Sequence, residues 1–257
     1  MNKEKDIKPE FDFKAVFEPD DYLYFYKDSL TEERTKAEID FLVKELQLDK
    51  SMKILDLACG HGRHANRLAK LGYNVTGVDI SQGFLEIAKK EAKEKGISVK
   101  YIQEDMRNIS FIEEFNRVLL LFTSFGYFED EENLKVLKNI ADALKPGGLF
   151  CFDTANRDEF LKHILPYKVT EKGNDLMIDR ITFDSITGRL YNRRIIIRNG
   201  KREDKPFFVR FYNPTEIRDL LEKAGLEIYK MYGDWQANPF TSGSTRMIII
   251  AEKPKGK

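Results

Sequence analysis

The sequence Lys53-Ile54-Leu55-Asp56-Leu57-Ala58-Cys59-Gly60-His61-Gly62-Arg63-His64 decides the fold class of this chain. Its apolar start predicts a strand over residues 53–57, and two glycines one residue apart predict a sharp turn after it. Because glycine has no Cβ atom, a ligand can approach the backbone of this turn closely. A helix predicted from about Gly62 to Leu71 directs its free N–H groups toward the same place. The stretch therefore predicts a nucleotide-like ligand at the carboxyl end of the first strand of an α/β sheet.

Strands and helices alternate along most of the chain. Apolar runs predict strands over residues 53–57, 73–79, 98–103, 117–122, 149–153, 226–232 and 246–251. Amphipathic stretches predict helices over residues 31–46, 62–71, 82–95, 131–144 and 214–224, with Thr31 as the N-cap of the first. This alternation is typical of a parallel sheet with helices on both faces, so we expect an α/β fold with a doubly wound, seven-stranded, mostly parallel sheet.

The pattern changes between residues 167 and 212, where helical periodicity is missing. Three runs of alternating β-branched or aromatic residues cover 176–183, 190–198 and 207–211. Good turn sequences join them at 185–188 and 198–201. These features predict an antiparallel β meander inserted after the fifth strand of the sheet.

Composition argues against several classes of function. Lysine plus arginine and aspartate plus glutamate both total 43, so the chain lacks the excess of positive charge that nucleic-acid binding requires, and we expect no nucleic-acid partner. No apolar run is long enough to cross a bilayer, so we expect no membrane association. Residues 1–10 are interpreted as a loose polar tail without the apolar segment of a signal peptide, and two cysteines make no disulfide framework. A cytoplasmic location is therefore predicted.

Histidines and cysteines show no metal-site spacing. The chain has three histidines and no carboxylate-rich cluster beside them, so no metal is predicted. We interpret His61 and His64 as loop and helix-surface residues.

Five motifs, in order along the chain, resemble those of class I S-adenosylmethionine-dependent methyltransferases over about residues 31–252. They are Asp56-Leu57-Ala58-Cys59-Gly60-His61-Gly62, Gly77-Val78-Asp79-Ile80-Ser81, Glu104-Asp105-Met106, Leu121-Phe122-Thr123-Ser124-Phe125 and Leu144-Lys145-Pro146-Gly147-Gly148. The resemblance implies a Rossmann-like methyltransferase fold with S-adenosyl-L-methionine as the cofactor. It also implies an enzyme that moves a methyl group to a small-molecule acceptor by direct in-line displacement.

On this interpretation the chain divides into four parts. Residues 1–30 form an N-terminal tail and lid, and residues 31–166 form the cofactor-binding core. Residues 167–212 form the inserted antiparallel β subdomain on the substrate side, and residues 213–257 complete the core sheet.

The resemblance assigns a role in cofactor binding to each motif. The loop at Gly60 passes under the methionine and ribose parts, and Asp79 accepts hydrogen bonds from both ribose hydroxyls. Asp105 accepts from the adenine amino group, the Met106 N–H meets a ring nitrogen, and the Leu121 carbonyl faces the ammonium group. The predicted cofactor-binding set is Tyr26, Arg34, Asp56, Ala58, Gly60, Gly62, Asp79, Ile80, Asp105, Met106 and Leu121.

Arg34 carries a finer resemblance, to the glycine N-methyltransferase group. It lies 22 residues before Asp56, where members of that group have an arginine that meets the cofactor carboxylate, and Ser124-Phe125 matches a second feature of the group. A planar guanidinium suits a carboxylate because it donates two parallel hydrogen bonds. The alternative is a solvated helix charge paired with Glu38, four residues further on.

Several other assignments stay open. Asp56 either contacts the cofactor or braces its own loop through hydrogen bonds. Tyr22, Tyr24 and Tyr26 either fold over the cofactor as part of the lid or form a half-buried edge strand. Family members usually carry an aspartate at the position of Asn116, and this departure concerns the start of the fourth strand rather than the chemistry.

Residues that follow the fourth and fifth strands are expected at the mouth of the crevice, where an acceptor would lie. The end of the meander returns to the same region. The predicted substrate-binding set is Thr123, Phe125, Tyr127, Asn156, Arg157, Arg210 and Tyr212. No side chain stands out as a general base, so no catalytic residue is predicted; an amine acceptor needs none, whereas a hydroxyl does.

Three alternative functions remain. Residues 60–65 also fit the Gly-x-Gly-x-x-Gly/Ala fingerprint of NAD enzymes, so one alternative is an NAD-dependent oxidoreductase. The others are an RNA or protein methyltransferase and a nucleotide-binding module without turnover. The motifs at 104–106 and 144–148 have no role in a dinucleotide fold and favour the methyltransferase interpretation. These patterns leave the oligomeric state open.

Overall fold

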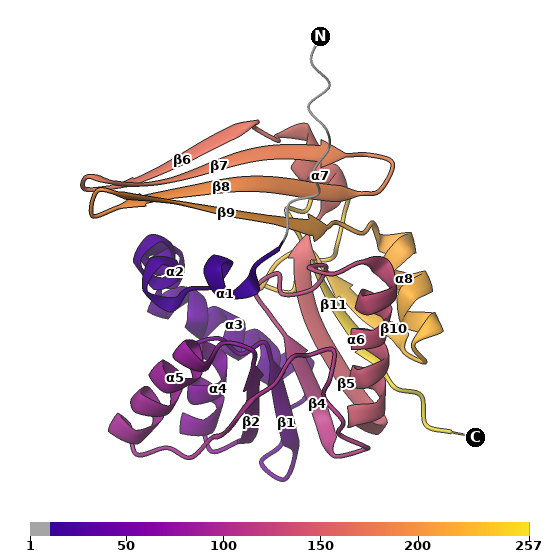
Figure 1. Cartoon of the computed structure of the whole chain (residues 1–257). Coiled ribbons are helices and arrows are strands. Elements are labelled where there is room, and N and C mark those ends of the chain that lie inside the picture. The colour runs from indigo at the N-terminus through magenta and orange to yellow at the C-terminus, as the bar shows by residue number, and fades with distance from the viewer. Residues whose placement is uncertain (1–10, 257) are drawn as a thin grey trace.

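Two β-sheets organise the computed structural model, which describes residues 11–256 (Figure 1). The larger sheet has seven strands in the order β10-β11-β5-β4-β1-β2-β3. Its strands are β1 Lys53–Leu57, β2 Asn74–Asp79, β3 Lys100–Gln103, β4 Phe115–Leu120, β5 Leu144–Ala155, β10 Glu227–Tyr232 and β11 Arg246–Glu252. Strand β11 alone runs opposite to the other six strands of this sheet, so the predicted doubly wound, seven-stranded, mostly parallel sheet is confirmed. The tail predicted over residues 1–10 lies outside the described residues.

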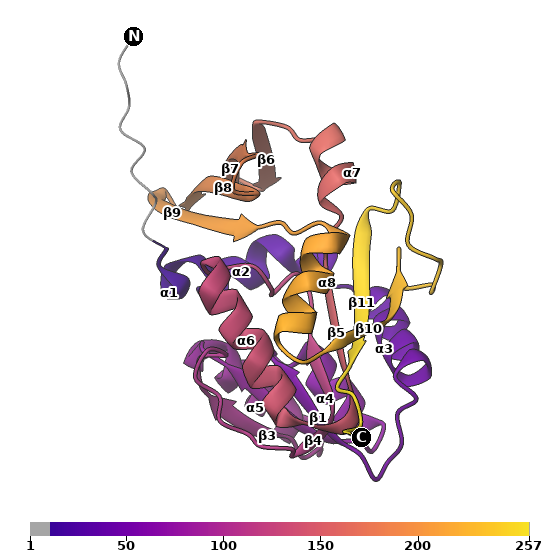
Figure 2. The same ribbon diagram turned by 90° about the vertical axis from the view of Figure 1, so that its right-hand side faces the viewer.

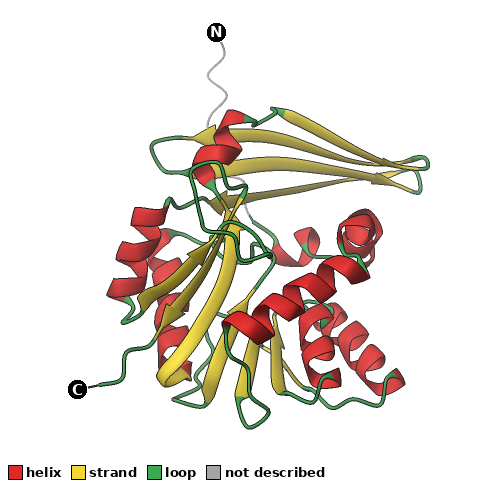
Figure 3. Cartoon of the chain, turned by 180° about the vertical axis from the view of Figure 1, so that it is seen from behind, coloured by secondary structure: helices red, strands yellow, loops and turns green. Residues whose placement is uncertain are grey.

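Helices cover both faces of the larger sheet (Figure 3). The helices are α3 Glu32–Glu45, α4 Arg63–Lys70, α5 Gln82–Glu94, α6 Asp130–Ala143 and α8 Pro214–Lys223. Helices α6 and α8 pack over Leu55 and Phe150, whereas α3 and α4 pack over Ile54 and Cys151. Successive side chains of a strand point to opposite faces, so the continuous apolar runs of β1 and β5 supply both layers of the core.

The helices are short on the scale of a bilayer. The helices α3 and α6 have 14 residues each. Within residues 11–256 we find no helix that combines the length and the apolar character needed to span a membrane.

The smaller sheet has four antiparallel strands in the order β6-β7-β8-β9, one strand more than the sequence predicts. They are β6 Tyr167–Lys172, β7 Asp175–Asp184, β8 Arg189–Arg198 and β9 Lys201–Arg210. The pattern of apolar residues missed β6 and the first half of β9 because their side chains are largely exposed and polar. Figure 2 shows this sheet on the side of the larger sheet toward which β5 runs, with the short helix α7 Arg157–Lys162 beside the smaller sheet.

The N-terminal helices lie between the two sheets (Figure 1). They are α1 Phe13–Val16, α2 Pro19–Tyr26 and a 3-10 turn at Lys27–Ser29. The edge-strand alternative for the three tyrosines is wrong, because all three belong to α2. Pro19 at the first helical position starts this helix, and the Glu18 carboxylate accepts a hydrogen bond from the Asp21 N–H at 2.8 Å.

Ion pairs fasten α2 to the smaller sheet. Asp21 accepts from Arg198 at 2.8 Å and from Lys205 at 2.7 Å. Tyr24 donates its hydroxyl to the Lys172 carbonyl at 3.0 Å. Burial acts to raise the pKa of Asp21, but Lys205 and Arg198 lower it below its usual value. The smaller sheet thus holds α2 in place over the larger one.

Asn116 joins the starts of two neighbouring strands. Its Oδ1 atom accepts a hydrogen bond from the Lys53 N–H at 3.0 Å, which links the start of β4 to the start of β1. An amide oxygen fills the acceptor position that an aspartate would fill, so the departure from the family pattern keeps this contact.

The loop after β1 is tightly packed around Gly62, and a substitution at this glycine tests that packing. Its φ is +78°, and a Cβ atom there would meet the Tyr101 hydroxyl and would lie 2.8 Å from Ala88 Cβ. Gly96 has a similar φ of +64°, but a Cβ atom there would meet nothing within 4 Å. We expect Gly62→Ala to lower the free energy of unfolding by at least about 2 kcal/mol and Gly96→Ala by about 1 kcal/mol, measured by urea denaturation. Equal losses would contradict the tight packing at Gly62.

Candidate functional site

A cavity opens at the carboxyl ends of β1, β2 and β4, and we name it the first cavity. Its wall is made by the segments that follow these strands and by aromatic side chains of the N-terminal helices, including Phe17 and Tyr22. Four carboxylates belong to this wall: Asp56, Asp79, Glu104 and Asp105. Ligands of open α/β sheets bind at the carboxyl ends of the strands, so this is the expected location for one. The carboxylates favour a ligand that carries positive charge.

The loop after β1 exposes its backbone to the first cavity. Ala58 has a φ of +53° and Gly60 a φ of +54°, a region that non-glycine residues rarely adopt. A Cβ atom at Gly60 would meet nothing within 4 Å, so a ligand has room to lie against this part of the backbone. Strained backbone of this kind is often found at functional sites.

Asp79, at the end of β2, fixes this loop. Its Oδ2 atom accepts from the Gly60 N–H at 2.7 Å, and its Oδ1 atom accepts from the Ser81 N–H at 2.8 Å. Each oxygen keeps a second lone pair for a ligand hydroxyl. Burial raises the pKa of Asp79, and further donors from a ligand would favour its ionised form.

Asp56 is a buried carboxyl group with an unused acceptor. It is 1% exposed, and its Oδ2 atom has no hydrogen-bond partner among the described residues. Burial raises its pKa to about 7, although the Arg63 charge acts in the opposite direction. A buried polar atom without a partner calls for a ligand, and an ammonium group would satisfy it and favour its ionised form.

Glu38 organises the cationic side of the two helices that flank the loop. This α3 carboxylate is 1% exposed and contacts Arg34 of its own helix and Arg63 and His64 of α4. The Arg34 Nε atom lies 2.8 Å from Glu38 Oε1, and the His64 Nε2 atom lies 2.8 Å from Oε2. Burial acts to raise the pKa of Glu38, but His64, Arg63 and Arg34 lower it to about 2.

The turn after β4 is held in an unusual backbone conformation. Phe122 and Thr123 have φ values of +64° and +59°. The Phe122 N–H donates to Asp153 Oδ1 at 2.6 Å, and the Ser124 hydroxyl donates to the Leu121 carbonyl at 2.7 Å. Two guanidinium groups, those of Arg34 and Arg63, lie over the Phe122 ring at 4.9 and 5.4 Å from its centroid.

Arg107 holds Asp105 on the wall of the first cavity. Its Nη2 atom donates to Asp105 Oδ2 at 2.6 Å, and its backbone N–H donates to Oδ1 at 2.8 Å. The same guanidinium reaches Glu132 of α6 at 2.6 Å. Burial acts to raise the pKa of Asp105, but hydrogen bonds from Arg107 lower it. Asp105 is therefore a fixed, ionised acceptor.

A second cavity adjoins the first and differs from it in charge. Five residues line both cavities: Phe17, Tyr22, Phe122, Ser124 and Tyr127. The second cavity is also lined by Arg34, Arg194 and Arg246, and among the described residues on its wall none is acidic. The first cavity thus has four carboxylates and one arginine on its wall, whereas the second has three arginines and no carboxylate among its described lining residues, with aromatic side chains shared between them.

Comparisons with known proteins agree on one family. A family described as "Methyltransferase domain" matches residues 54–148. A putative methyltransferase of Geobacillus sp. (strain WCH70) is 32% identical over 90% of this chain and 98% of its own length. A glycine/sarcosine N-methyltransferase of Halorhodospira halochloris is 30% identical over 86% of this chain and 82% of its own. This chain is an S-adenosylmethionine-dependent methyltransferase.

Solved structures show the same fold for the methyltransferase. A structure of an S-adenosylmethionine-dependent methyltransferase from Clostridium acetobutylicum matches with a TM-score of 0.78 and 21% identity, over 91% of this chain and 97% of that one. The class I family and its cofactor, predicted from the five motifs, are confirmed. Membership of this family removes the NAD-dependent oxidoreductase alternative.

Most predicted cofactor residues of the methyltransferase meet at the first cavity. Eight of the eleven line it: Asp56, Ala58, Gly60, Asp79, Ile80, Asp105, Met106 and Leu121. Gly62 lies behind the loop, at the start of α4. The other two, Tyr26 and Arg34, line the second cavity instead. Arg34 makes the ion pair with Glu38 that its alternative interpretation predicts, but that carboxylate is buried rather than solvated.

Two of the seven predicted acceptor residues line the cavities. Tyr127 lines both, and Thr123 lines the second, where its hydroxyl accepts from Arg246 Nη2 at 2.7 Å. The other five line neither of these cavities: Phe125, Asn156, Arg157, Arg210 and Tyr212. Phe125 is buried in the core, and Asn156 caps α7 and donates to the Ser244 carbonyl at 2.8 Å.

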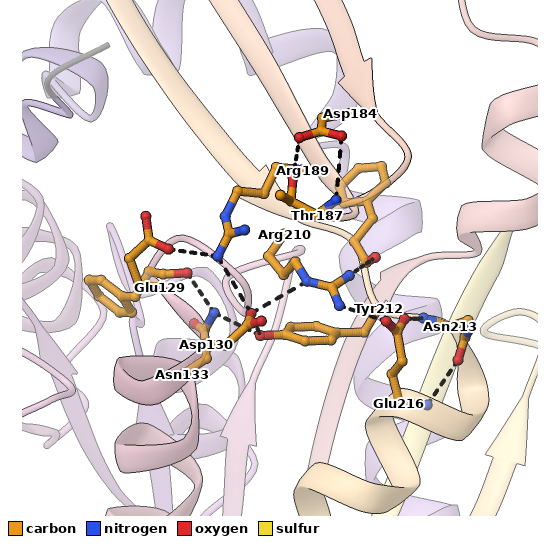
Figure 4. A network of polar contacts seen from close by, with 12 residues as sticks. Glu129, Asp130, Asn133, Asp184, Thr187, Arg189, Arg210, Tyr212, Asn213 and Glu216 are labelled. Carbon is orange, nitrogen blue, oxygen red and sulfur yellow. Dashed lines mark hydrogen bonds and ion pairs between the residues drawn. The ribbon is translucent and has the colours of Figure 1, made fainter. Parts of the chain in front are cut away.

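Arg210 and Tyr212 instead form a polar junction, which Figure 4 shows from close by. The Tyr212 hydroxyl donates to Asp130 of α6 at 2.7 Å. Arg210 donates to Glu216 of α8 at 2.6 Å, and Arg157 also reaches Glu216, at 3.0 Å. These contacts join the end of β9 to two helices of the larger sheet, which accounts for the charged and aromatic residues at this point of the chain.

Some residues on the wall of the first cavity were not predicted from the sequence. Phe13, Phe17 and Phe84 line the first cavity, and the aromatic-rich stretch 11–26 was the available signal for the first two. His64, interpreted as a helix-surface residue, is 6% exposed, and this interpretation is wrong. The reason is Glu38, whose burial requires hydrogen-bond donors from the facing helix.

Asp56→Asn tests whether the orphaned carboxylate oxygen receives the cofactor. Below its pKa of about 7 the carboxyl group is mainly protonated, and a bound ammonium group would ionise it, so binding should release a proton. We expect affinity for S-adenosylhomocysteine to rise between about pH 6 and about pH 8 by about five-fold or more in the wild type relative to Asp56→Asn.

Calorimetry in buffers of different ionisation enthalpy measures the released proton. The exposed Asp142 of α6 supplies the matched control, Asp142→Asn, which should behave as the wild type. Equal proton release by the wild type and Asp56→Asn would contradict the role of Asp56.

Proposed function

We propose that this methyltransferase transfers a methyl group to a nitrogen atom of a small-molecule acceptor, by direct in-line displacement. The observation that supports this is the chemistry of the wall shared by the two cavities. The shared side chains are aromatic or carry only a hydroxyl group. A neutral amine attacks without assistance, whereas a hydroxyl acceptor needs a base to remove its proton.

The tyrosines and histidines nearby are poorly suited to act as bases at neutral pH. Burial, together with the neighbouring tyrosines, raises the pKa of Tyr22 and of Tyr127, so both keep their protons. Burial lowers the pKa of His61 to about 4, which makes it a weak base. His64 is engaged by Glu38. The side chains therefore favour an acceptor that is nucleophilic when neutral.

The residues of the chain contribute alignment and exclusion of water. When bound, S-adenosylmethionine supplies the methyl group on a positively charged sulfur, which makes it a strong electrophile. Asp79 and the Gly60 backbone would hold the ribose and methionine parts, and the buried oxygen of Asp56 would receive the ammonium group. Phe17 and Tyr22 add aromatic surface to the wall of this region. Fixed orientation of the two reactants is the main source of rate in a displacement of this kind.

Three relatives have names that support a nitrogen acceptor, whereas a relative from Coxiella burnetii (strain Dugway 5J108-111), 30% identical over 72% of this chain and 67% of its own length, is named a ubiquinone biosynthesis O-methyltransferase. The name of the Halorhodospira halochloris relative is glycine/sarcosine N-methyltransferase, and a relative from Aphanothece halophytica, 31% identical over 86% of this chain and 83% of its own length, has the same name. A cypemycin N-terminal methyltransferase from Streptomyces sp is 28% identical over 78% of this chain. These three names concern nitrogen methylation of small molecules and of a peptide terminus.

Labelled methyl transfer tests the proposal. Purified protein is incubated with S-adenosylmethionine carrying a labelled methyl group and a cell extract, which is then separated into metabolites, peptides, proteins and RNA. We expect label in the metabolite fraction, on a nitrogen atom identified by mass fragmentation. Asp79→Ala should lose the label, and Asp204→Ala, a change at an exposed carboxylate of β9, should retain it.

Any other outcome contradicts one part of the proposed function. Label on oxygen contradicts the nitrogen acceptor, and label in peptide, protein or RNA contradicts the small-molecule acceptor. Binding of S-adenosylhomocysteine without any transfer of label would favour a binding module without turnover.

A further inference from the structure

We propose that the acceptor carries an anionic group, a carboxylate or a phosphate, which Arg246 and Arg34 bind in the second cavity. This inference rests on the proposed function and narrows the class of its acceptor. It places the acceptor's anion in the second cavity and its nitrogen at the wall shared with the first.

Charge is unbalanced around the second cavity. Three arginines line it, Arg34, Arg194 and Arg246, and the guanidinium group of Arg63 lies close by, 5.4 Å from the centroid of the Phe122 ring. Each of Arg194 and Arg246 has its own carboxylate, Asp179 and Asp153, whereas Arg34 and Arg63 share the single carboxylate of Glu38. Within these ion pairs, four guanidinium groups thus face three carboxylates. The carboxylate of Glu38 therefore neutralises only one of the two guanidinium charges that it binds.

Arg246 has hydrogen-bonding capacity to spare. Its bonds to described residues come from Nη2, which contacts Asp153 and the Thr123 hydroxyl. Its Nε atom is buried and has no acceptor among the described residues. Such a donor without an acceptor is rare in a folded protein, and a bound anion would supply the missing acceptor through the planar fork of the guanidinium.

Arg34 faces the same space as Arg246. Its Nε atom donates to Glu38 at 2.8 Å and its Nη1 atom to the Ser29 carbonyl at 3.2 Å, so donors remain on the guanidinium. Burial, and then the charge of Arg34, lowers the pKa of Arg246 to about 10. The two cations therefore repel each other across the cavity. An anion between them would remove that repulsion.

The cofactor has a carboxylate of its own, so the anion has two sources. The second cavity extends away from the loop after β1, because Arg194 and Phe207 of the smaller sheet line it together with Val16 of α1. Arg63, by contrast, lines the first cavity and is available to the cofactor. This division assigns the second cavity to the acceptor rather than to the cofactor. In this proposal Arg34, which lines the second cavity, binds the acceptor's anion in place of the cofactor carboxylate that the resemblance assigns to it.

The test measures anion binding to protein whose cofactor site is filled. Protein saturated with S-adenosylhomocysteine is titrated with inorganic phosphate, acetate and, as the uncharged match of acetate, acetamide. Calorimetry should show saturable binding of one anion per chain and none of acetamide. Arg246→Gln and Arg34→Gln should each weaken anion binding at least about ten-fold. Arg67→Gln is the matched control, because Arg67 is equally exposed at 25% but pairs with Glu32 outside both cavities, and it should change nothing.

Three results would overturn the inference. They are no saturable anion binding, equal binding of acetamide, and equal weakening by Arg67→Gln and Arg246→Gln. If an arginine variant does not fold, the difference between acetate binding and acetamide binding to the wild type still tests the inference.

A second titration separates the two sources of the anion. It uses protein saturated with 5′-methylthioadenosine, which lacks the amino-acid part of the cofactor. Acetate that binds here but not beside S-adenosylhomocysteine identifies the second cavity as the site of the cofactor carboxylate, which contradicts the inference. Neither titration depends on turnover, so anion binding without labelled methyl transfer defeats the proposed function and leaves the anion site intact.

Discussion

The buried carboxylate of Glu38 is the contact on which both cavities depend. It joins α3 to the start of α4 and draws Arg63 and His64 inward, next to the glycine loop. Because its pKa is held at about 2, it stays ionised across the physiological range. Without it, cationic side chains would be buried with no partner, a change that commonly costs about 3–5 kcal/mol. The two guanidinium groups that lie over the Phe122 ring, those of Arg34 and Arg63, are both held by this one carboxylate.

Opposite charges on adjoining walls give the site its chemical character. The carboxylates of the first cavity suit a cofactor with a positively charged sulfur and an ammonium group, whereas the arginines of the second suit an anion. Between them lie aromatic side chains that exclude water and offer no strong base. Such an arrangement brings an electrophilic methyl group next to an uncharged nucleophile. The charged groups of the cofactor and of the acceptor lose water when they bind, and the fixed charges of the two walls take the place of that water.

Sequence patterns predicted the parts of the molecule that depend on local order. The strand at residues 53–57, the glycine turn and Asp79 lie where their periodicity and spacing put them, because each is decided by neighbours in the chain. The second cavity could not be predicted from sequence patterns. Its arginines at positions 34, 194 and 246 come from α3, β8 and β11, so only the folded chain brings them together. Arg210 and Tyr212 carry the residue types of a binding site, but long-range partners on α6 and α8 turn them into a structural junction.

A crystal structure of the complex with S-adenosylhomocysteine is the most direct test of the central claim, which is that the reacting sulfur faces the wall shared by the two cavities. We expect the ribose hydroxyls to contact Asp79, the ammonium group to contact Asp56, and the sulfur to point toward Tyr127 and Ser124. A complex with the sulfur turned away from these two residues, or with the amino-acid carboxylate of the ligand bound by Arg246, would contradict the account.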